Sequence, residues 1–210
     1  MNVNTVKDVY PLPRISEIFD EIHGAKYFAS LDLLMGYHQI GVKAEDRQKT
    51  AFITHKGLFV FNRIPFGLCN SPATFQRLMD RVFPRHLFRN VLAYLDDLLI
   101  FARTEEELLA KLEETLRVLA SVGLKCKTRK CKLFRPDISY LGYVISKDGI
   151  SPDLSKIEKI RQWPFPLTGL GMMSFWACAT IIELLFPVLR SGLLLSMRVR
   201  EILRLHKHLN

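Results

Sequence analysis

Two adjacent aspartates, Asp96 and Asp97, lie between two apolar runs and could bind a divalent cation. The runs cover residues 91–93 and 98–101. This pattern predicts two buried strands with the acids at the turn that joins them. Because burying ionised carboxylates is costly unless a partner compensates, an acidic turn between apolar strands favours a metal site. An Asp-Asp pair is also common in surface turns, so the metal interpretation depends on further acids.

A third acid, Asp32, follows the strand-like segment 27–31. A single aspartate after a strand is most often a turn or cap residue. Together with Asp96 and Asp97, however, it could complete a three-carboxylate site for two Mg²⁺ ions, about 3.5–4 Å apart, with Mn²⁺ as a possible substitute. One ion would activate an attacking 3′-hydroxyl, and the other would bind a triphosphate and its leaving group. Mg²⁺ suits such a site because it keeps waters and substrate phosphates among its ligands.

The bulk composition fits an intracellular protein that acts on a polyanion. The 210 residues can form one core, or one domain with an extension, and their net charge of +9 favours nucleic-acid partners. A basic protein without such a partner is the alternative. Cys126 and Cys131 have no paired Cys/His set, which disfavours zinc, and the free thiols suit a reducing compartment. No signal peptide opens the chain, so we expect a cytoplasmic or nuclear protein.

Alternating strand and helix patterns predict an α+β fold, with an antiparallel sheet covered by helices. Besides the aspartate hairpin, strands are expected over residues 27–33, 39–42, 51–54, 58–63 and 133–145. Helices are expected over residues 14–23, 71–83, 104–123 and 154–163. Ser71 should cap the second helix with Pro72 in its first turn, and Thr104 should cap the third. The apolar stripe of the third helix is Leu108, Leu112, Leu116 and Leu119.

Several motifs in a fixed order resemble the reverse transcriptases of Gypsy/Ty3-type long-terminal-repeat retrotransposons. They occupy residues 5–8, 10–14, 31–33, 36–40, 49–52, 65–68, 70–76, 94–97, 123–125, 130–131 and 141–146. The resemblance covers about residues 4–166 and implies a polymerase palm with part of the fingers. It also implies RNA-directed DNA polymerase activity, with dNTP and a primed RNA or DNA template as partners.

The resemblance implies a catalytic role for four residues. Asp32, Asp96 and Asp97 match the metal-binding carboxylates of the palm, with Asp32 and Asp96 carrying most of the coordination. Lys130 matches a lysine proposed to protonate the departing pyrophosphate. A surface lysine is the alternative interpretation of Lys130.

Other matched residues would contact substrates. Tyr37 would pack under the incoming sugar and exclude a 2′-hydroxyl, unless it is only a core tyrosine. Phe66 and Gly67 would line the nucleotide pocket, where glycine permits a close backbone approach. Gln76 would contact the template, unless it is a solvated helix position. The segment Leu141, Gly142 and Tyr143 would grip the primer end, and an ordinary hairpin is the alternative there.

The composition changes after residue 166, so we expect a family domain over residues 1–166 and a foreign tail over 167–210. Back-translation of residues 173–189, shifted by two bases, permits a continuation similar to the family's own, which favours out-of-frame translation. A membrane-spanning segment over the apolar residues 170–189 is the alternative, although a membrane partner is not expected. Because the family has further fingers and thumb segments, we expect impaired catalysis. A non-catalytic nucleic-acid-binding remnant is the alternative function.

Overall fold

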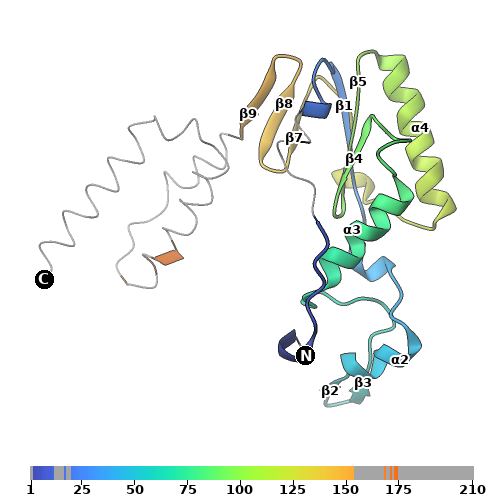
Figure 1. Cartoon of the computed structure of the whole chain (residues 1–210), viewed down its shortest axis with the longest axis vertical. Helices are drawn as coiled ribbons and strands as arrows, with labels where there is room; N and C mark the ends of the chain where they lie inside the picture. The colour runs from blue at the N-terminus through green and yellow to red at the C-terminus, as the bar shows by residue number, and fades with distance from the viewer. Residues whose placement is uncertain are drawn as a thin grey trace, which may run out of the picture. The chain divides into compact units, whose positions relative to one another are not determined.

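The structure, a computed structural model, describes residues 2–11, 17, 20–153, 168, 171, 173 and 174. The chain divides into two compact units, residues 1–151 and 152–210, and nearly all described elements belong to the first (Figure 1). Half of the predicted helix over 14–23 lies outside the described residues, and residues 17, 20 and 21 within it are helical. The predicted helix over 154–163 and the domain boundary at residue 166 lie outside them, as does nearly all of the tail over 167–210.

A four-stranded antiparallel sheet forms the centre of the first unit. Its order is β4-β5-β1-β6, and the strands are β1 (Tyr27–Asp32), β4 (Val91–Tyr94), β5 (Asp97–Ala102) and β6 (Lys132–Arg135). The aspartate hairpin predicted from the sequence is therefore confirmed as β4 and β5. Leu98, Leu99 and Ile100 of β5 are completely buried, because both faces of this sheet are covered.

Two helices, α3 (Ser71–Val82) and α4 (Glu105–Ser121), cover one face of the sheet (Figure 1). Phe75 and Met79 of α3 share a buried cluster with Leu98 and Ile100 of β5, to which α4 also contributes leucines. Apolar burial of this kind supplies most of the stabilisation of such a layer. The packing of these helices therefore holds in place the end of the sheet at which β5 begins.

The caps of the two helices agree with the sequence only in part. Thr104 caps α4 as predicted, because its hydroxyl accepts the Glu107 N–H at 3.2 Å. The predicted Ser71 cap is wrong: Asn70 is the N-cap residue of α3, and the Ser71 hydroxyl is buried without a hydrogen-bond partner. The Asn70 side chain accepts the Asp8 N–H and donates to the Val6 carbonyl, so it fastens the N-terminal segment to the helix.

A small sheet of β7 (Asp137–Tyr140), β8 (Tyr143–Ser146) and β9 (Gly149–Pro152) contributes to a second buried cluster. Ile138, Tyr140 and Ile145 there meet Phe28 and Leu99, on the face of the central sheet opposite the helices. The hairpin β7–β8 thereby lies against the strands that carry Asp32 and Asp97. The predicted α+β class, with antiparallel strands and helices, is confirmed.

A smaller region contains α2 (Ala44–Arg47), η3 (Gln48–Thr50) and the hairpin β2 (Phe52–Thr54) and β3 (Gly57–Phe59). The predicted strand over 39–42 is wrong. A 3-10 turn, η2 (Gly36–Gln39), replaces its start, and only Gly41 forms a bridge, to Arg63. The Gln39 side chain explains the difference. It bonds to the backbone of Leu34 and Lys125, and these bonds hold the segment in a turn instead of an extended strand.

In the part of the chain that the structure describes, no helix is both long and apolar enough to cross a membrane. The apolar segment 170–189 lies almost entirely outside that part.

Candidate active site

The three acids singled out from the sequence lie at one edge of the central sheet. Asp32 ends β1 and is the register partner of Asp97, which begins β5. Asp96 occupies the two-residue turn after Tyr94. Its carbonyl accepts the Leu33 N–H at 2.9 Å, so the turn is bonded to the end of β1. The topology thus brings together acids that are more than 60 positions apart in the sequence.

Lys130 also reaches this edge. Its Nζ lies 2.8 Å from Oδ2 of Asp32, and this bond raises the pKa of Lys130 above its ordinary value. The turn η4 (Thr128–Lys130) positions the lysine, because the Lys127 N–H donates to the Asp32 carbonyl at 2.8 Å. Asp32 is therefore held through both its backbone and its side chain by the same short segment.

The edge concentrates negative charge. Burial raises the pKa of Asp97, the charges of Asp96 and Asp32 raise it further, and Lys130 opposes them. Carboxylate oxygens are the donors that Mg²⁺ and Mn²⁺ prefer, so the donor chemistry fits a hard divalent cation. Among the described residues, no three His, Cys, Asp or Glu side chains form a ready metal cluster. The carboxylates would therefore have to turn inward to share an ion.

Gln76 holds the acidic turn. Its side chain is completely buried, so the solvated position considered from the sequence is wrong. Nε2 donates to the Ala93 carbonyl at 3.1 Å, and Oε1 accepts the Leu95 N–H at 2.8 Å. Direct contact with a template would require this hairpin to move away. A spacing of three residues from the buried Met79 on the same helix is the signal that could have revealed the burial.

Tyr37 and Phe66 pack together beside the acids. Their ring centroids are 5.5 Å apart, and Tyr37 is also 5.6 Å from Phe75. Burial raises the pKa of Tyr37, and the charge of Asp96 adds to that effect. Phe66 remains 60% exposed. An exposed aromatic ring thus stands next to a half-buried tyrosine close to the carboxylate edge.

Gly36 explains how the aromatic cluster can lie so near Asp96. A Cβ atom at Gly36 would stand 3.0 Å from the Asp96 Cβ and 2.9 Å from the Phe75 ring. The backbone of Gly36 is not in the left-handed region, so glycine is needed here for space.

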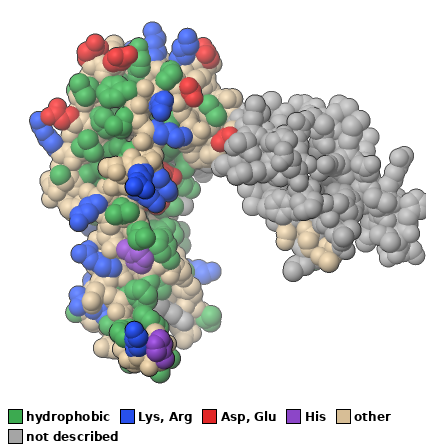
Figure 2. All heavy atoms as spheres, turned by 180° about the vertical axis from the view of Figure 1, so that it is seen from behind, with side chains coloured by type: hydrophobic (Ala, Val, Ile, Leu, Met, Phe, Trp, Pro, Cys, Tyr) green, Lys and Arg blue, Asp and Glu red, His purple; other side chains and the backbone are tan. Residues whose placement is uncertain are grey.

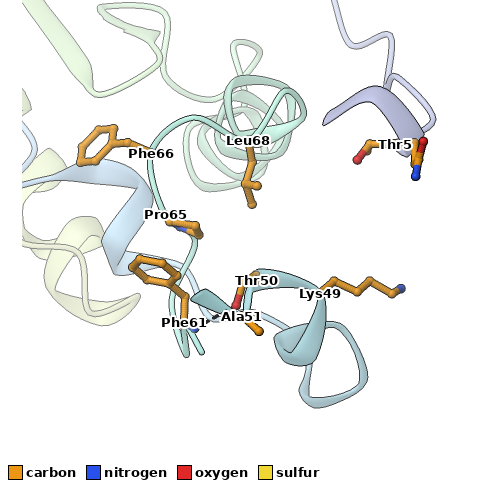
Figure 3. A pocket seen from close by; sticks show the side chains of 9 residues that line it. Thr5, Lys49, Thr50, Ala51, Phe61, Pro65, Phe66 and Leu68 are labelled. Carbon is orange, nitrogen blue, oxygen red and sulfur yellow. Dashed lines mark hydrogen bonds between the residues drawn. The ribbon is translucent and has the colours of Figure 1, made fainter. Parts of the chain in front are cut away.

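Phe66 borders a cavity of about 630 Å³, as do Pro65 and Leu68 on either side of its turn. Figure 3 shows Thr50, Phe61 and Pro65 on its wall, with the Phe66 ring directed away from Lys49. The Thr50 hydroxyl accepts the Phe61 N–H at 2.8 Å. Gly67 has φ = 90°, and its carbonyl accepts a bond from Asn2 Nδ2 at 2.7 Å. The N-terminal segment therefore holds Gly67 in place through the Asn2 side chain.

The segment predicted to grip a primer is the turn between β7 and β8. Leu141 and Gly142 form it with φ values of 50° and 92°. The preceding Tyr140 donates its hydroxyl to the Asp97 carbonyl at 3.3 Å. A cavity of about 480 Å³ is bordered by this turn, by the acids Asp32 and Asp97, and by basic side chains. Those basic residues are Arg129, Lys130, Lys132 and Arg135.

The sequence of residues 1–145 matches the family model described as reverse transcriptase (RNA-dependent DNA polymerase). The chain belongs to the reverse transcriptase family. Its relatives include the Pol polyproteins of transposons 297 and gypsy from Drosophila melanogaster, at 37% and 34% identity over 83% and 86% of this chain. The Tf2-3 polyprotein of Schizosaccharomyces pombe is 29% identical over 89% of it. The predicted resemblance to Gypsy/Ty3-type reverse transcriptases is therefore confirmed.

These relatives are much longer proteins, and the chain spans 16%, 17% and 14% of their respective lengths. Solved reverse transcriptases share the fold. The foamy viral protease-reverse transcriptase in complex with double-stranded DNA superposes with a TM-score of 0.78 at 22% identity, over 87% of this chain and 32% of that one. The same viral enzyme with an RNA/DNA hybrid gives a TM-score of 0.77, over 93% of this chain and 27% of that one. The predicted polymerase fold is confirmed.

Proposed function

We propose that this reverse transcriptase domain carries a nucleotidyl-transfer centre that adds dNTP to a primer 3′-hydroxyl on an RNA or DNA template. The observation that carries the proposal is the shared edge of Asp32, Asp96 and Asp97, with Lys130 bonded to Asp32. Phosphoryl transfer needs positioning and charge stabilisation more than covalent chemistry. A rigid sheet edge with three carboxylates meets that need.

Asp32, Asp96 and Asp97 would hold two divalent cations, Mg²⁺ or Mn²⁺, which lower the pKa of the attacking hydroxyl and stabilise the leaving oxygens. Asp32 would be shared between a cation and Lys130, since its Oδ2 already accepts the lysine. The bond to Asp32 raises the pKa of Lys130 and so favours its charged ammonium form. Lys130 would donate a proton to the departing pyrophosphate once a bound cation replaces it as the partner of Asp32.

The neighbouring groups supply substrate contacts in this proposal. Tyr37 lies against Phe66, and it is close enough to Asp96 for the charge of that residue to raise the pKa of Tyr37. A sugar bound near the acids would therefore rest on the Tyr37 ring. In that position the ring would leave little room for a 2′-hydroxyl and would select deoxynucleotides. Phe66 and Gly67 would border the same nucleotide. The Leu141–Gly142 turn and Tyr143 would place the primer end, because Tyr140 ties this hairpin to Asp97.

The surface charge suits a nucleic-acid partner. The chain has a net charge of +9. Figure 2 shows one face of the molecule, and Lys, Arg and His side chains lie along its lower half, which ends at the β2–β3 hairpin. Contacts with phosphates release counterions, so binding should be largely indifferent to sequence and should weaken steeply as salt increases. The foamy viral relatives of this fold were solved with double-stranded DNA and with an RNA/DNA hybrid, which supports the same partner here.

Primer extension on a primed RNA template tests the proposal directly. We expect dNTP incorporation with Mg²⁺ or Mn²⁺, loss of incorporation with a chelator, and none with a primer that ends in a dideoxynucleotide. Salt-dependent binding of the primed template without any extension, under both metals, would contradict the catalytic proposal. That result would favour the alternative of a non-catalytic nucleic-acid-binding remnant.

A further inference from the structure

A chain of hydrogen bonds connects the N-terminal segment to the acidic turn through helix α3. We propose that Tyr10, Asp80 and Gln76 are positioning residues that hold the turn of Asp96 in the geometry needed for nucleotidyl transfer. The proposal rests on the function proposed above. It adds that the N-terminal segment, residues 5–11, influences the acidic turn through the bond of Tyr10 to Asp80.

The first link is the contact of Gln76 with the turn. Its amide bonds to the Ala93 carbonyl on β4 and to the Leu95 N–H in the turn itself. Leu95 has φ = 53°, a conformation that L-residues with a side chain adopt only when their surroundings impose it. Because Gln76 is completely buried, water does not replace these bonds. Gln76 therefore holds a strained turn from one side.

The second link fixes the orientation of the Gln76 amide. An amide can turn over and exchange its donor and acceptor ends, and its neighbours decide which orientation is stable. Asp80 Oδ1 accepts from Gln76 Nε2 at 2.9 Å. A carboxylate can only accept, so Asp80 keeps Nε2 on its own side and leaves Oε1 facing the Leu95 N–H. The Ala93 carbonyl accepts from the same Nε2, so without Asp80 that single bond would have to hold the orientation.

The third link brings in the N-terminal segment. The Tyr10 hydroxyl donates to Asp80 Oδ2 at 2.6 Å. The Arg77 guanidinium lies 4.8 Å from the centre of the Tyr10 ring and pairs with Asp8 at 2.7 Å. The segment thus runs beside α3, as the dark blue trace in Figure 1 shows, and is fastened to it at several points. One carboxylate oxygen of Asp80 accepts from Tyr10 and the other accepts from Gln76. The second and third links therefore depend on the same carboxylate.

Asp80→Asn is the most informative substitution. Asparagine keeps the shape but removes the charge and replaces one acceptor oxygen with an NH₂ donor, so Tyr10 and Gln76 can no longer each donate to a carboxylate oxygen. Tyr10→Phe removes only the outer hydroxyl and serves as the milder variant if Asp80→Asn does not fold. Tyr27→Phe is the matched control, because the Tyr27 hydroxyl on β1 has no hydrogen bond to another described residue.

Hydrogen exchange of individual amides is the primary measurement, since it does not require polymerase activity. We expect the Leu95 amide to exchange about tenfold faster in Asp80→Asn and about threefold faster in Tyr10→Phe, while the Ile100 amide in β5 keeps its rate. Tyr27→Phe should leave both amides unchanged. In primer extension, kcat should fall about tenfold for Asp80→Asn and about threefold for Tyr10→Phe. The KM for dNTP should stay within about twofold of wild type in both variants.

Two outcomes would overturn the proposal. One is an unchanged Leu95 exchange rate in both variants. The other is an equal acceleration of Leu95 and Ile100, because that would show a general loss of stability rather than a loosened turn. If the wild type extends no primer, the exchange experiment still decides whether Tyr10, Asp80 and Gln76 position the turn, so the two proposals fail independently.

Discussion

Two hairpins of similar design meet at the proposed active site, and their turns are stabilised in different ways. Each turn has two residues and begins with a leucine in the left-handed region, Leu95 at φ = 53° and Leu141 at φ = 50°. In the β7–β8 turn, the next residue is Gly142, which adopts φ = 92° without a side chain to clash. In the β4–β5 turn, the next residue is Asp96.

The difference shows how a turn that carries acids is stabilised. The β7–β8 turn is encoded locally, because glycine at the second position suits the twist of a tight hairpin. The β4–β5 turn lacks that local solution and depends on Gln76, 19 positions earlier in the sequence. The turn with the proposed metal ligands is therefore specified by tertiary contacts.

The largest expected difference between the two hairpins concerns catalysis. Asp96→Asn preserves shape but removes a proposed metal ligand, so primer extension should fall by several powers of ten. Asp148→Asn, in the exposed turn between β8 and β9, is the matched control and should retain activity. Comparable extension by Asp96→Asn and wild type, with equal folding by circular dichroism, would show that the acidic turn is not the catalytic centre.

The next difference concerns stability. Gly142→Ala places a side chain at φ = 92° and should reduce the free energy of unfolding by about 1 kcal/mol. Leu95→Gly should be close to neutral, because relief of left-handed strain, about 1–2 kcal/mol, is largely offset by greater freedom of the unfolded chain. Urea denaturation of both variants measures the pair. A larger loss from Leu95→Gly than from Gly142→Ala would contradict the proposed contrast.

Tyr140 joins the two hairpins, so its hydroxyl tests whether they behave as one unit. Tyr140→Phe removes the bond to the Asp97 carbonyl, and we expect a loss of about 0.5–1.5 kcal/mol in the free energy of unfolding. Tyr27→Phe provides the control for loss of a hydroxyl. Amide exchange should show whether the effect reaches Asp97. A loss confined to β7 and β8 would mean that the contact does not couple the hairpins.

The smallest expected effect depends on pH. The pKa of Asp97 is raised in the folded chain, so ionised Asp97 opposes folding once the pH exceeds its unfolded pKa, about 3.9. Asp97→Asn should therefore raise the midpoint of thermal unfolding at pH 7. The gain should shrink as the pH falls and vanish below about pH 4, where the carboxyl is protonated in both states. A gain that is independent of pH would assign the effect to packing instead.

Local patterns in the sequence predicted the elements well where one type of residue decides the outcome. Apolar runs around Asp96 and Asp97 predicted β4 and β5, and Thr104 with acidic residues after it predicted the start of α4. The details failed where tertiary contacts intervene. Leu116 was expected in the core stripe of α4 but is 43% exposed, whereas Thr115 is buried and satisfies its hydroxyl on the Lys111 carbonyl.

The candidate site was predicted by residue type, but its supporting contacts could not be. Nothing local indicates that Lys130 would bond Asp32 across 98 positions, or that Gln76 would enter the interior. Both depend on how α3 and η4 pack against the sheet. The resemblance identified the residues, and only the three-dimensional arrangement shows which of them hold one another in place.

Gly36 has a consequence for how freely this sequence can vary. A Cβ at this position would meet the Phe75 ring and the Asp96 Cβ at once, so any replacement must displace either a core aromatic or a proposed ligand. At Gly41 nothing lies within 4 Å, and its φ is not positive. Two glycines five positions apart thus differ in mutational tolerance. A substitution at Gly41 should have little effect, whereas a single substitution at Gly36 should disturb both the proposed metal site and the packing of the core.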